Sequence, residues 1–150
     1  MSAPERWLFV CSGNICRSAM GEAFARRFAE DRGIELHVES AGTLGIVGEP
    51  ADPKAMRVCV EIGLDLGAHR SKALTTEQLL SADRILVMSE DHVRAAVGLE
   101  PGCADRIVRL GPLAGMLEVD DPHGSWFLRP YRRCREEIQR AVTRVFDARR

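Results

Sequence analysis

The segment Val10–Ser18, which reads VCSGNICRS, decides how the chain folds. The apolar run Trp7–Val10 leads into it and predicts a buried strand, while the apolar spacing from Ala19 to Arg32 predicts a helix after it. A strand that turns through glycine and asparagine into a helix leaves several backbone N–H groups without partners. Because such N–H groups can converge on one anion, the segment predicts a site for a phosphate group.

A thiol and a guanidinium lie within this turn. Cys11 is at its mouth, where the positive end of the helix dipole and the Arg17 cation both favour the thiolate, the nucleophilic form. The planar fork of Arg17 suits phosphate oxygens. We therefore predict that Cys11 attacks a bound phosphate held by Arg17 and by the loop. The substrate-binding loop residues that we predict are Ser12, Gly13, Asn14, Ile15, Cys16 and Ser18.

The composition is typical of a soluble globular protein. With 150 residues, the chain is long enough for one domain with a full core, and we expect a single domain over residues 1–150. A hydrophobic fraction of 45% and a net charge of -1 argue against nucleic acid or an anionic membrane as a partner. No apolar run approaches the roughly 18 residues of a membrane span, and the N-terminal residues lack a long apolar stretch. We expect a cytoplasmic monomer.

The cysteine count argues against both disulfides and metal. Five cysteines are an odd number in a chain without a secretory signal, so we expect free thiols. A zinc site that used Cys11 and Cys16 would lack a second pair of ligands at suitable spacing. Because Arg17 and the loop amides already supply a positive field, we predict neither a metal nor another cofactor.

Strand-like runs and helical patterns alternate along the chain. The predicted strands are Trp7–Val10, Leu36–Ser40, Arg84–Met88 and Arg106–Leu110. The predicted helices span residues 19–32, 52–63, 75–80, 89–97 and 130–148, and the second should bury Ala55, Met56, Cys59, Val60 and Ile62. Such alternation predicts an α/β fold, a three-layer, doubly wound, four-stranded parallel sheet with helices on both faces. The long connections Ala41–Ala51 and Gly111–Arg129 should line the binding crevice.

A phosphate monoester also needs an acid to protonate its leaving oxygen. Asp120 and Asp121 compete for this role, and Asp121 is favoured because it directly precedes Pro122, which stiffens the turn. Among the histidines, His123 is expected at the rim of the site, whereas His37 and His92 are expected on the surface.

The segment Cys11–Ser18, together with Asp121-Pro122, resembles the low-molecular-weight protein tyrosine phosphatases. The resemblance covers nearly the whole chain and implies a phosphoric monoester hydrolase with a cysteinyl-phosphate intermediate. It implies that Asp121 protonates the leaving phenolate and then deprotonates the attacking water. It also implies supporting residues: Ser18 would donate a hydrogen bond to the Cys11 thiolate, while Ser40 and His69 would hold Asn14.

The resemblance implies a phosphorylated protein as substrate, with phosphotyrosine first and a tyrosine kinase as a further partner. Protein arginine phosphatases of the same fold are the alternative, but their loop carries threonine where this chain has Ile15, so the tyrosine branch is favoured. A catalytically silent phosphate-binding module is a second alternative. It would have lost the nucleophile or the acid, whereas Cys11 and Asp121 are both present.

The sequence offers two pairs of apolar residues as candidate walls of the site. His123 and Gly124 replace the aromatic pair that often follows Asp-Pro in the family and helps to grip the substrate ring. Trp126 or Phe127 could supply an aromatic surface nearby, with core packing as the alternative. Leu44 and Ile46 are the candidates for the opposite wall, again with core packing as the alternative.

Cys16 has two interpretations. Within the resembled family the two loop cysteines can close a reversible disulfide under oxidant, which would make Cys16 a redox partner of Cys11. The alternative is a buried spacer.

Overall fold

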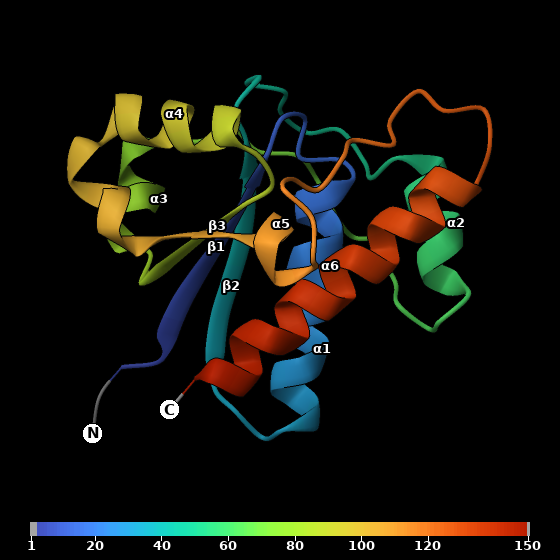
Figure 1. Ribbon diagram of the computed structural model, residues 1–150, viewed down its shortest axis with the longest axis horizontal. Helices are drawn as coiled ribbons and strands as arrows, with labels where there is room; N and C mark the ends of the chain where they lie inside the picture. Colours follow the sequence, from blue (N-terminus) through green and yellow to red (C-terminus); the bar gives the residue numbers. More distant parts are fainter. Residues whose placement is uncertain (1–2, 150) are drawn as a thin grey trace.

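A computed structural model of the protein describes residues 3–149 (Figure 1). Its sheet consists of β1 (Glu5–Cys11), β2 (Leu36–Gly42), β3 (Arg84–Val87) and β4 (Ile107–Arg109). The strands lie in the order β2-β1-β3-β4, and every neighbouring pair is parallel. Since helices cover both faces, the predicted α/β fold with a four-stranded parallel sheet is confirmed.

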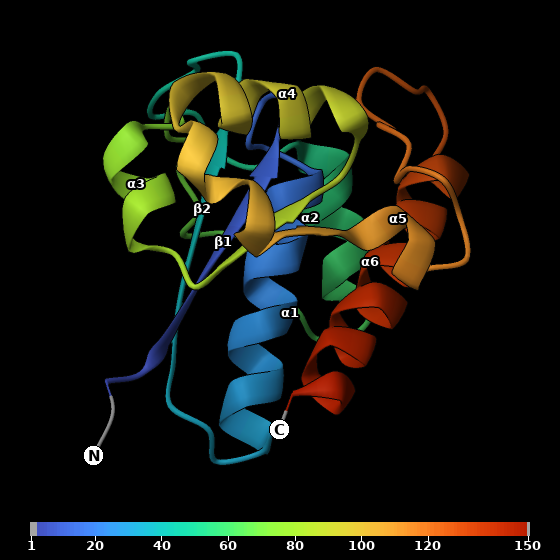
Figure 2. The same cartoon turned by 60° about the vertical axis from the view of Figure 1, so that its left-hand side comes forward.

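The helices form two outer layers (Figures 1 and 2). They are α1 (Arg17–Asp31), α2 (Pro53–Val60), α3 (Thr76–Ser81), α4 (Glu90–Leu99), α5 (Leu110–Leu113), α6 (Arg129–Ala148) and the 3₁₀ helix η1 (Pro101–Arg106). In β1, Trp7 and Phe9 pack into the core beneath α1, α2 and α6, while Leu8 and Val10 pack beneath α3, α4 and η1. Burial on both faces explains why β1 is an unbroken apolar run.

Helix ends follow local signals in the sequence. Asp52 accepts a hydrogen bond from Lys54 N at 2.8 Å and caps α2, and Pro53 occupies the first turn. Thr75 and Gln78 form a complete capping box at the start of α3. Gly33 follows α1 with φ of 64°, a left-handed conformation that suits glycine.

The prediction for α2 was wrong at its C-terminal end. The helix stops at Val60, three residues before the predicted end, and the Val60 side chain is 65% exposed. Val58 is buried in its place, together with Ala55 and Cys59, because these positions share the stripe that faces α6. Ile62 is half-buried in the turn that follows.

The short elements η1 and α5 were not predicted. Each is six residues or fewer, too short to show a helical period. Over residues 3–149, none of the helices is both long and apolar enough to cross a membrane.

The far end of the molecule is closed by an aromatic cluster and an ion pair. The Phe146 ring on α6 lies 4.8 Å from the Trp7 ring and 5.9 Å from the Phe28 ring, centroid to centroid. Arg149 Nε, just beyond α6, lies 2.9 Å from Glu5 Oε2 at the start of β1. Figure 1 shows the start of β1 and the end of α6 on the side of the molecule opposite the turn between β1 and α1.

Candidate active site

Residues 12–16 form the turn that joins β1 to α1, and neighbouring segments fix their orientation. Thr43 N and Leu44 N donate to the carbonyls of Cys11 and Ser12, both at 3.0 Å, and Asp52 N donates to the Ile15 carbonyl at 2.8 Å. In a planar trans peptide the next N–H group points opposite to the carbonyl. The N–H groups that follow these three carbonyls therefore point away from the segments that hold the loop, where they can meet an anion.

The Cys11 sulfur is buried and has two hydrogen-bond partners. Ser18 Oγ lies 2.9 Å from Cys11 Sγ, and Asn14 N donates to the sulfur at 3.3 Å. Asn14 Nδ2 donates to the same Ser18 oxygen at 2.7 Å, so the hydroxyl proton of Ser18 is free to point at the sulfur. The backbone N–H of Asn14 and the Ser18 hydroxyl can thus both donate hydrogen bonds to Cys11 Sγ.

Asn14 adopts a left-handed backbone conformation, with φ of 59°, and several neighbours hold it there. Its side-chain amide donates to Ser40 Oγ at 2.9 Å and accepts from Lys72 N at 2.9 Å. His69 Nε2 lies 2.5 Å from the Asn14 carbonyl oxygen, and Ser40 in turn donates to Glu22. The predicted supporting residues Ser40 and His69 thus both contact Asn14.

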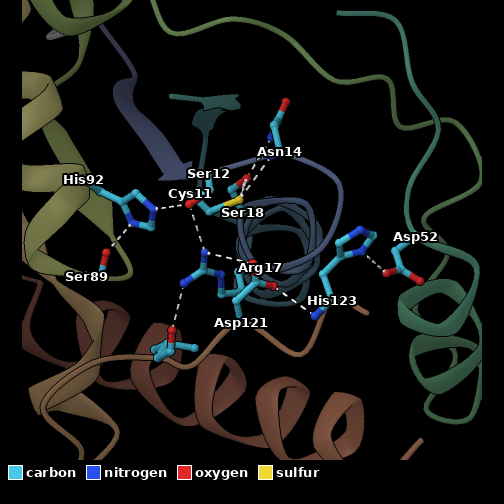
Figure 3. A network of polar contacts seen from close by, with 11 residues as sticks. Cys11, Ser12, Asn14, Arg17, Ser18, Asp52, Ser89, His92, Asp121 and His123 are labelled. Atoms are coloured by element: carbon cyan, nitrogen blue, oxygen red, sulfur yellow. Dashed lines mark hydrogen bonds and ion pairs between the residues drawn. The ribbon is translucent and has the colours of Figure 1, made fainter. Parts of the chain in front are cut away.

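The Arg17 side chain is only 6% exposed, and both terminal nitrogens of its guanidinium have hydrogen-bond partners (Figure 3). Arg17 Nη1 donates to the Val119 carbonyl at 2.9 Å, and Nη2 donates to Ser12 Oγ at 3.3 Å. Nη2 also lies 3.5 Å from Asp121 Oδ2. The guanidinium therefore spans the gap between the loop and the segment that carries Asp121.

A pocket of about 180 Å³ opens above the loop. Cys11 and Arg17 line it, and so do six of the eight predicted substrate-binding residues, namely Ser12, Gly13, Ile15, Cys16, Leu44 and His123. Asn14 and Ser18 were also predicted to contact substrate, but they do not line the pocket. Their side chains are fully buried behind the loop, where they bond to each other and to Ser40 and Cys11.

Asp121 is the aspartate that faces this pocket. Its Oδ1 accepts a hydrogen bond from His123 N at 3.0 Å, and its side chain is 46% exposed. Asp120 does not line the pocket and instead borders a separate hollow with Arg133 and Glu137. The arrangement favours Asp121 over Asp120 as the proton donor.

His123 lies at the pocket rim, where an aspartate holds its ring. Its Nδ1 is 2.8 Å from Asp52 Oδ2, which also accepts a hydrogen bond from the Tyr131 hydroxyl at 2.7 Å. Burial raises the pKa of Asp52, but the hydrogen bonds from His123, Tyr131 and Lys54 outweigh it, and the pKa stays below its usual value. Asp52 is therefore a carboxylate and His123 Nδ1 carries a proton. The rim is thereby tied to the start of α2 and to α6.

The prediction that His92 lies on the surface was wrong. Its side chain is 1% exposed, with Nε2 3.0 Å from Ser12 Oγ and Nδ1 3.2 Å from Ser89 Oγ (Figure 3). Burial and the nearby Arg17 cation lower the pKa of His92 to about 4, so its ring is neutral near pH 7. The first turn of α4 lies over the carboxyl edge of the sheet and points this residue inward. His37 is exposed.

The walls of the pocket are partly apolar. Leu44 and Ile46 line it, although the Leu44 side chain is 68% exposed. Trp126 and Phe127 do not line it, and at 90% and 75% exposure they do not pack into the core either. Core packing is thus excluded for both aromatic residues, and neither borders the pocket as it stands.

All five cysteines are free thiols, and Cys16 is buried. A hydrogen bond to Cys134 on α6, together with burial, raises the pKa of Cys16 well above its ordinary value. This contact could not be predicted from the sequence, because Cys16 lies in the turn before α1 and Cys134 lies on α6, 118 positions further along the chain. Within residues 3–149, no group of three or more His, Cys, Asp or Glu side chains is arranged to hold a metal ion.

Several known proteins have sequences similar to this chain. A family model described as low molecular weight phosphotyrosine protein phosphatase matches residues 6–149. The probable low molecular weight protein-tyrosine-phosphatase EpsP of Ralstonia solanacearum is 37% identical over 116 residues, which make up 77% of each chain. The low molecular weight protein-tyrosine-phosphatase Wzb of Escherichia coli strain K12 is 32% identical over 136 residues, 91% of this chain and 84% of its own.

Solved structures agree with the sequence relatives. The low molecular weight protein tyrosine phosphatase from T. tengcongensis matches with a TM-score of 0.89 and 34% identity, over 97% of this chain and 99% of that one. The YwlE arginine phosphatase from Geobacillus stearothermophilus matches with a TM-score of 0.85 and 32% identity, over 97% and 92%. The sequence motif, the fold and these relatives agree, and the chain belongs to the low molecular weight phosphotyrosine protein phosphatase family.

Proposed function

We propose that the protein hydrolyses phosphotyrosine in proteins through a cysteinyl-phosphate intermediate. The observation that carries the proposal is the shared pocket, in which the Cys11 sulfur, the Arg17 guanidinium and the Asp121 carboxyl group line one cavity. These groups supply the nucleophile, the anchor for phosphate oxygens and the proton donor that monoester hydrolysis requires.

In the first step Cys11 Sγ attacks phosphorus, and the bond from phosphorus to the phenolic oxygen breaks. Asp121 gives its proton to that oxygen, so the leaving group departs as a neutral phenol. In the second step the Asp121 carboxylate takes a proton from water, whose oxygen attacks phosphorus. The sulfur–phosphorus bond breaks and regenerates the Cys11 thiolate, which the Ser18 hydroxyl at 2.9 Å stabilises as a leaving group.

Arg17 and the loop stabilise the phosphoryl group in both steps. Arg17 approaches it from a fixed position, because Val119 and Ser12 already hold its two terminal nitrogens. The backbone N–H groups of the loop supply further donors without reorganisation, provided that Asn14 keeps its left-handed conformation. This positive field supports a mechanism that uses no metal or other cofactor.

Phosphoarginine is the second candidate substrate, because YwlE arginine phosphatases are among the structural neighbours. The apolar Ile15 side chain at the pocket wall and the apolar Leu44 and Ile46 favour an aryl group. Comparing phosphate release from phosphotyrosine and phosphoarginine peptides decides between the two. Faster turnover of phosphoarginine would overturn the tyrosine assignment.

The test of the enzyme itself is turnover of p-nitrophenyl phosphate. We expect the wild-type protein to be active and Cys11→Ser to be inactive, because the serine hydroxyl is a far weaker nucleophile than a thiolate. The Cys16→Ser variant is the matched control and should keep most of the activity. A wild-type protein that binds phosphate but does not turn over would instead indicate a silent binding module.

Several finer features are part of the proposal. The partner is a phosphorylated protein, with a tyrosine kinase among the candidates, and the protein acts as a cytoplasmic monomer built as one domain.

We also propose that oxidant joins Cys11 and Cys16 in a reversible disulfide, because both sulfurs lie on one short loop and line one pocket. Mass spectrometry of peroxide-treated protein, with Cys16→Ser as control, tests the disulfide.

A further inference from the structure

The strongest feature outside the proposed chemistry is a chain of polar contacts beside the loop. Arg17 Nη2 donates to Ser12 Oγ at 3.3 Å, Ser12 Oγ lies 3.0 Å from His92 Nε2, and His92 Nδ1 lies 3.2 Å from Ser89 Oγ (Figure 3). This series of contacts begins at the guanidinium in the pocket and ends at Ser89, the residue that precedes α4. The supporting contacts of Asn14 lie on a different set of residues.

The direction of each hydrogen bond follows from what the groups can donate. A guanidinium only donates, so Ser12 Oγ is the acceptor of Arg17 and keeps its own proton for another partner. Among residues 3–149, His92 Nε2 is the acceptor in reach of that proton. The Nδ1 atom then carries the ring proton and donates it to Ser89 Oγ. This pattern needs a neutral imidazole, in agreement with the burial of His92 against Arg17.

We propose that His92 is a positioning residue for the phosphate-binding guanidinium, acting through Ser12. By accepting the Ser12 proton, His92 turns the Ser12 lone pair toward Arg17 Nη2 and fixes that arm of the fork. Val119 fixes the other arm, so the remaining N–H groups of Arg17 keep one direction for the phosphoryl oxygens. The role in turnover rests on the proposed phosphatase function, whereas the role in holding phosphate does not.

The test uses variants that keep the volume of the buried site. His92→Phe fills the space but has no acceptor for the Ser12 proton, while the amide oxygen of His92→Gln can take the place of Nε2. We expect His92→Phe to weaken the binding of inorganic phosphate, and to lower kcat/KM for p-nitrophenyl phosphate, by about tenfold, the effect of one hydrogen bond. His92→Gln should recover most of the loss. The exposed His37→Ala is the matched control and should match wild type.

A double variant separates positioning from mere structural support. If His92 acts through Ser12, Ser12→Ala combined with His92→Phe should lose no more phosphate affinity than Ser12→Ala alone. The proposal would be overturned if the double variant lost phosphate affinity by the product of the two single losses. It would also be overturned if His92→Phe bound phosphate as tightly as wild type. The unfolding temperature of each variant is measured alongside. If His92→Phe proves to be destabilised, the phosphate affinities of Ser12→Ala and His92→Gln test the proposal instead: Ser12→Ala should bind phosphate more weakly, and His92→Gln should bind it nearly as well as wild type.

Calorimetric titration with inorganic phosphate needs no turnover, and this keeps the two proposals apart. Wild-type protein that fails to hydrolyse p-nitrophenyl phosphate would refute the proposed function. Weaker phosphate binding in His92→Phe would still support the positioning role in that case. Active wild-type protein with the same phosphate affinity in His92→Phe would refute the positioning role and leave the function standing.

Discussion

At the scale of single residues, the two oxygens of Asp121 have different neighbours. Oδ1 accepts from the backbone of His123, and Oδ2 faces Arg17 at 3.5 Å. The first contact orients the carboxyl group toward the pocket, and the second brings it beside the group that holds the phosphate. In the proposed mechanism, Asp121 uses this position to give a proton to the leaving oxygen and to take one from the attacking water.

The Asp121→Ala substitution should slow hydrolysis of a phosphotyrosine peptide by roughly 10²- to 10⁴-fold, the range for one acid–base group. The reason is that the leaving phenolate would depart without a proton. The neighbouring Asp120→Ala substitution is the matched control and should stay near wild type, because Asp120 does not line the pocket. Steady-state kcat for both variants checks the assignment, and a larger loss in Asp120→Ala would reverse it.

His92 predicts how stability depends on pH. Burial and Arg17 hold the pKa of folded His92 at about 4, against an ordinary value of 6.5, although Asp91, Glu118 and Asp121 act in the opposite direction. The unfolded chain therefore binds the proton more readily, and stability is fully present above pH 6.5 and is lost as the pH falls toward 4.

Between pH 7 and pH 5 this one group should remove about 2 kcal/mol from the free energy of unfolding of the wild-type protein. The His92→Gln variant lacks the titrating ring and should lose correspondingly less over the same interval. Urea unfolding of both proteins at the two pH values measures the difference. Equal losses would mean that folded His92 titrates normally.

Neighbours in the sequence were easier to predict than neighbours in space. The roles of Cys11, Asn14 and Arg17 could be proposed because all three lie within seven consecutive residues, between a predicted strand and a predicted helix. The inward position of His92 depends on where α4 meets the sheet, and the contact of Asp52 with His123 joins residues 71 positions apart. The sequence around Asp52 predicts that it caps α2, but it does not predict the contact of Asp52 with His123.

At the scale of elements, the end of β2 is packed directly against the phosphate-binding loop. A Cβ atom at Gly42 would stand 2.7 Å from the Ser12 carbonyl oxygen and 3.1 Å from Asn14 Cβ. Backbone atoms cannot retreat from such a contact without moving the loop. The C-terminal end of β2 therefore constrains the position of the loop, in addition to pairing with β1 in the sheet.

Gly42→Ala should lower kcat/KM for p-nitrophenyl phosphate by about 10- to 100-fold, because a loop displaced by a fraction of an ångström aims its donors poorly. Gly98→Ala is the control: Gly98 lies on α4 with open space around it and should tolerate alanine or gain stability. Kinetics and thermal unfolding of both variants make the comparison. Full activity in Gly42→Ala would show that the loop adapts.

The long elements could be predicted from their periods and the short helix α3 from its capping box, whereas η1 and α5 carry neither signal and were not predicted. The 20 residues of α6 repeat their apolar side chains over several turns, and β1 is apolar throughout. By contrast, α2 has two turns of helix, so its end at Val60 depends on packing against α6. The four residues of α5 follow from the turn that returns the chain from β4 toward the pocket.

At the scale of the whole molecule, the pocket and the tightest aromatic packing lie at opposite ends. The Trp7, Phe28 and Phe146 rings join β1, α1 and α6 far from the loop. The aromatic side chains that stabilise the fold and the residues that line the pocket thus lie in different parts of the molecule. The sequence predicted the sheet and its layers but not this division, since it depends on which ends of α1 and α6 meet.

Phe146→Ala should therefore lower the free energy of unfolding by about 3 to 5 kcal/mol, as expected for a buried aromatic ring. The KM for p-nitrophenyl phosphate should stay within twofold of wild type, roughly the experimental scatter expected for a remote change. Phe127→Ala, at 75% exposure, is the stability control and should change the free energy of unfolding by less than about 0.5 kcal/mol. A large rise in KM for Phe146→Ala would show that the two ends are coupled.

The ion pair between Glu5 and Arg149 brings the start of β1 close to the residue that follows α6. A linker of a few residues could join its ends, and the chain could be reopened at the exposed turn around Gly33, which also lies away from the pocket. In such a circular permutant the order of the elements changes, while each contact to the phosphate-binding loop is kept. Turnover of p-nitrophenyl phosphate at the wild-type rate would show that the catalytic geometry depends on how the layers meet rather than on where the polypeptide starts.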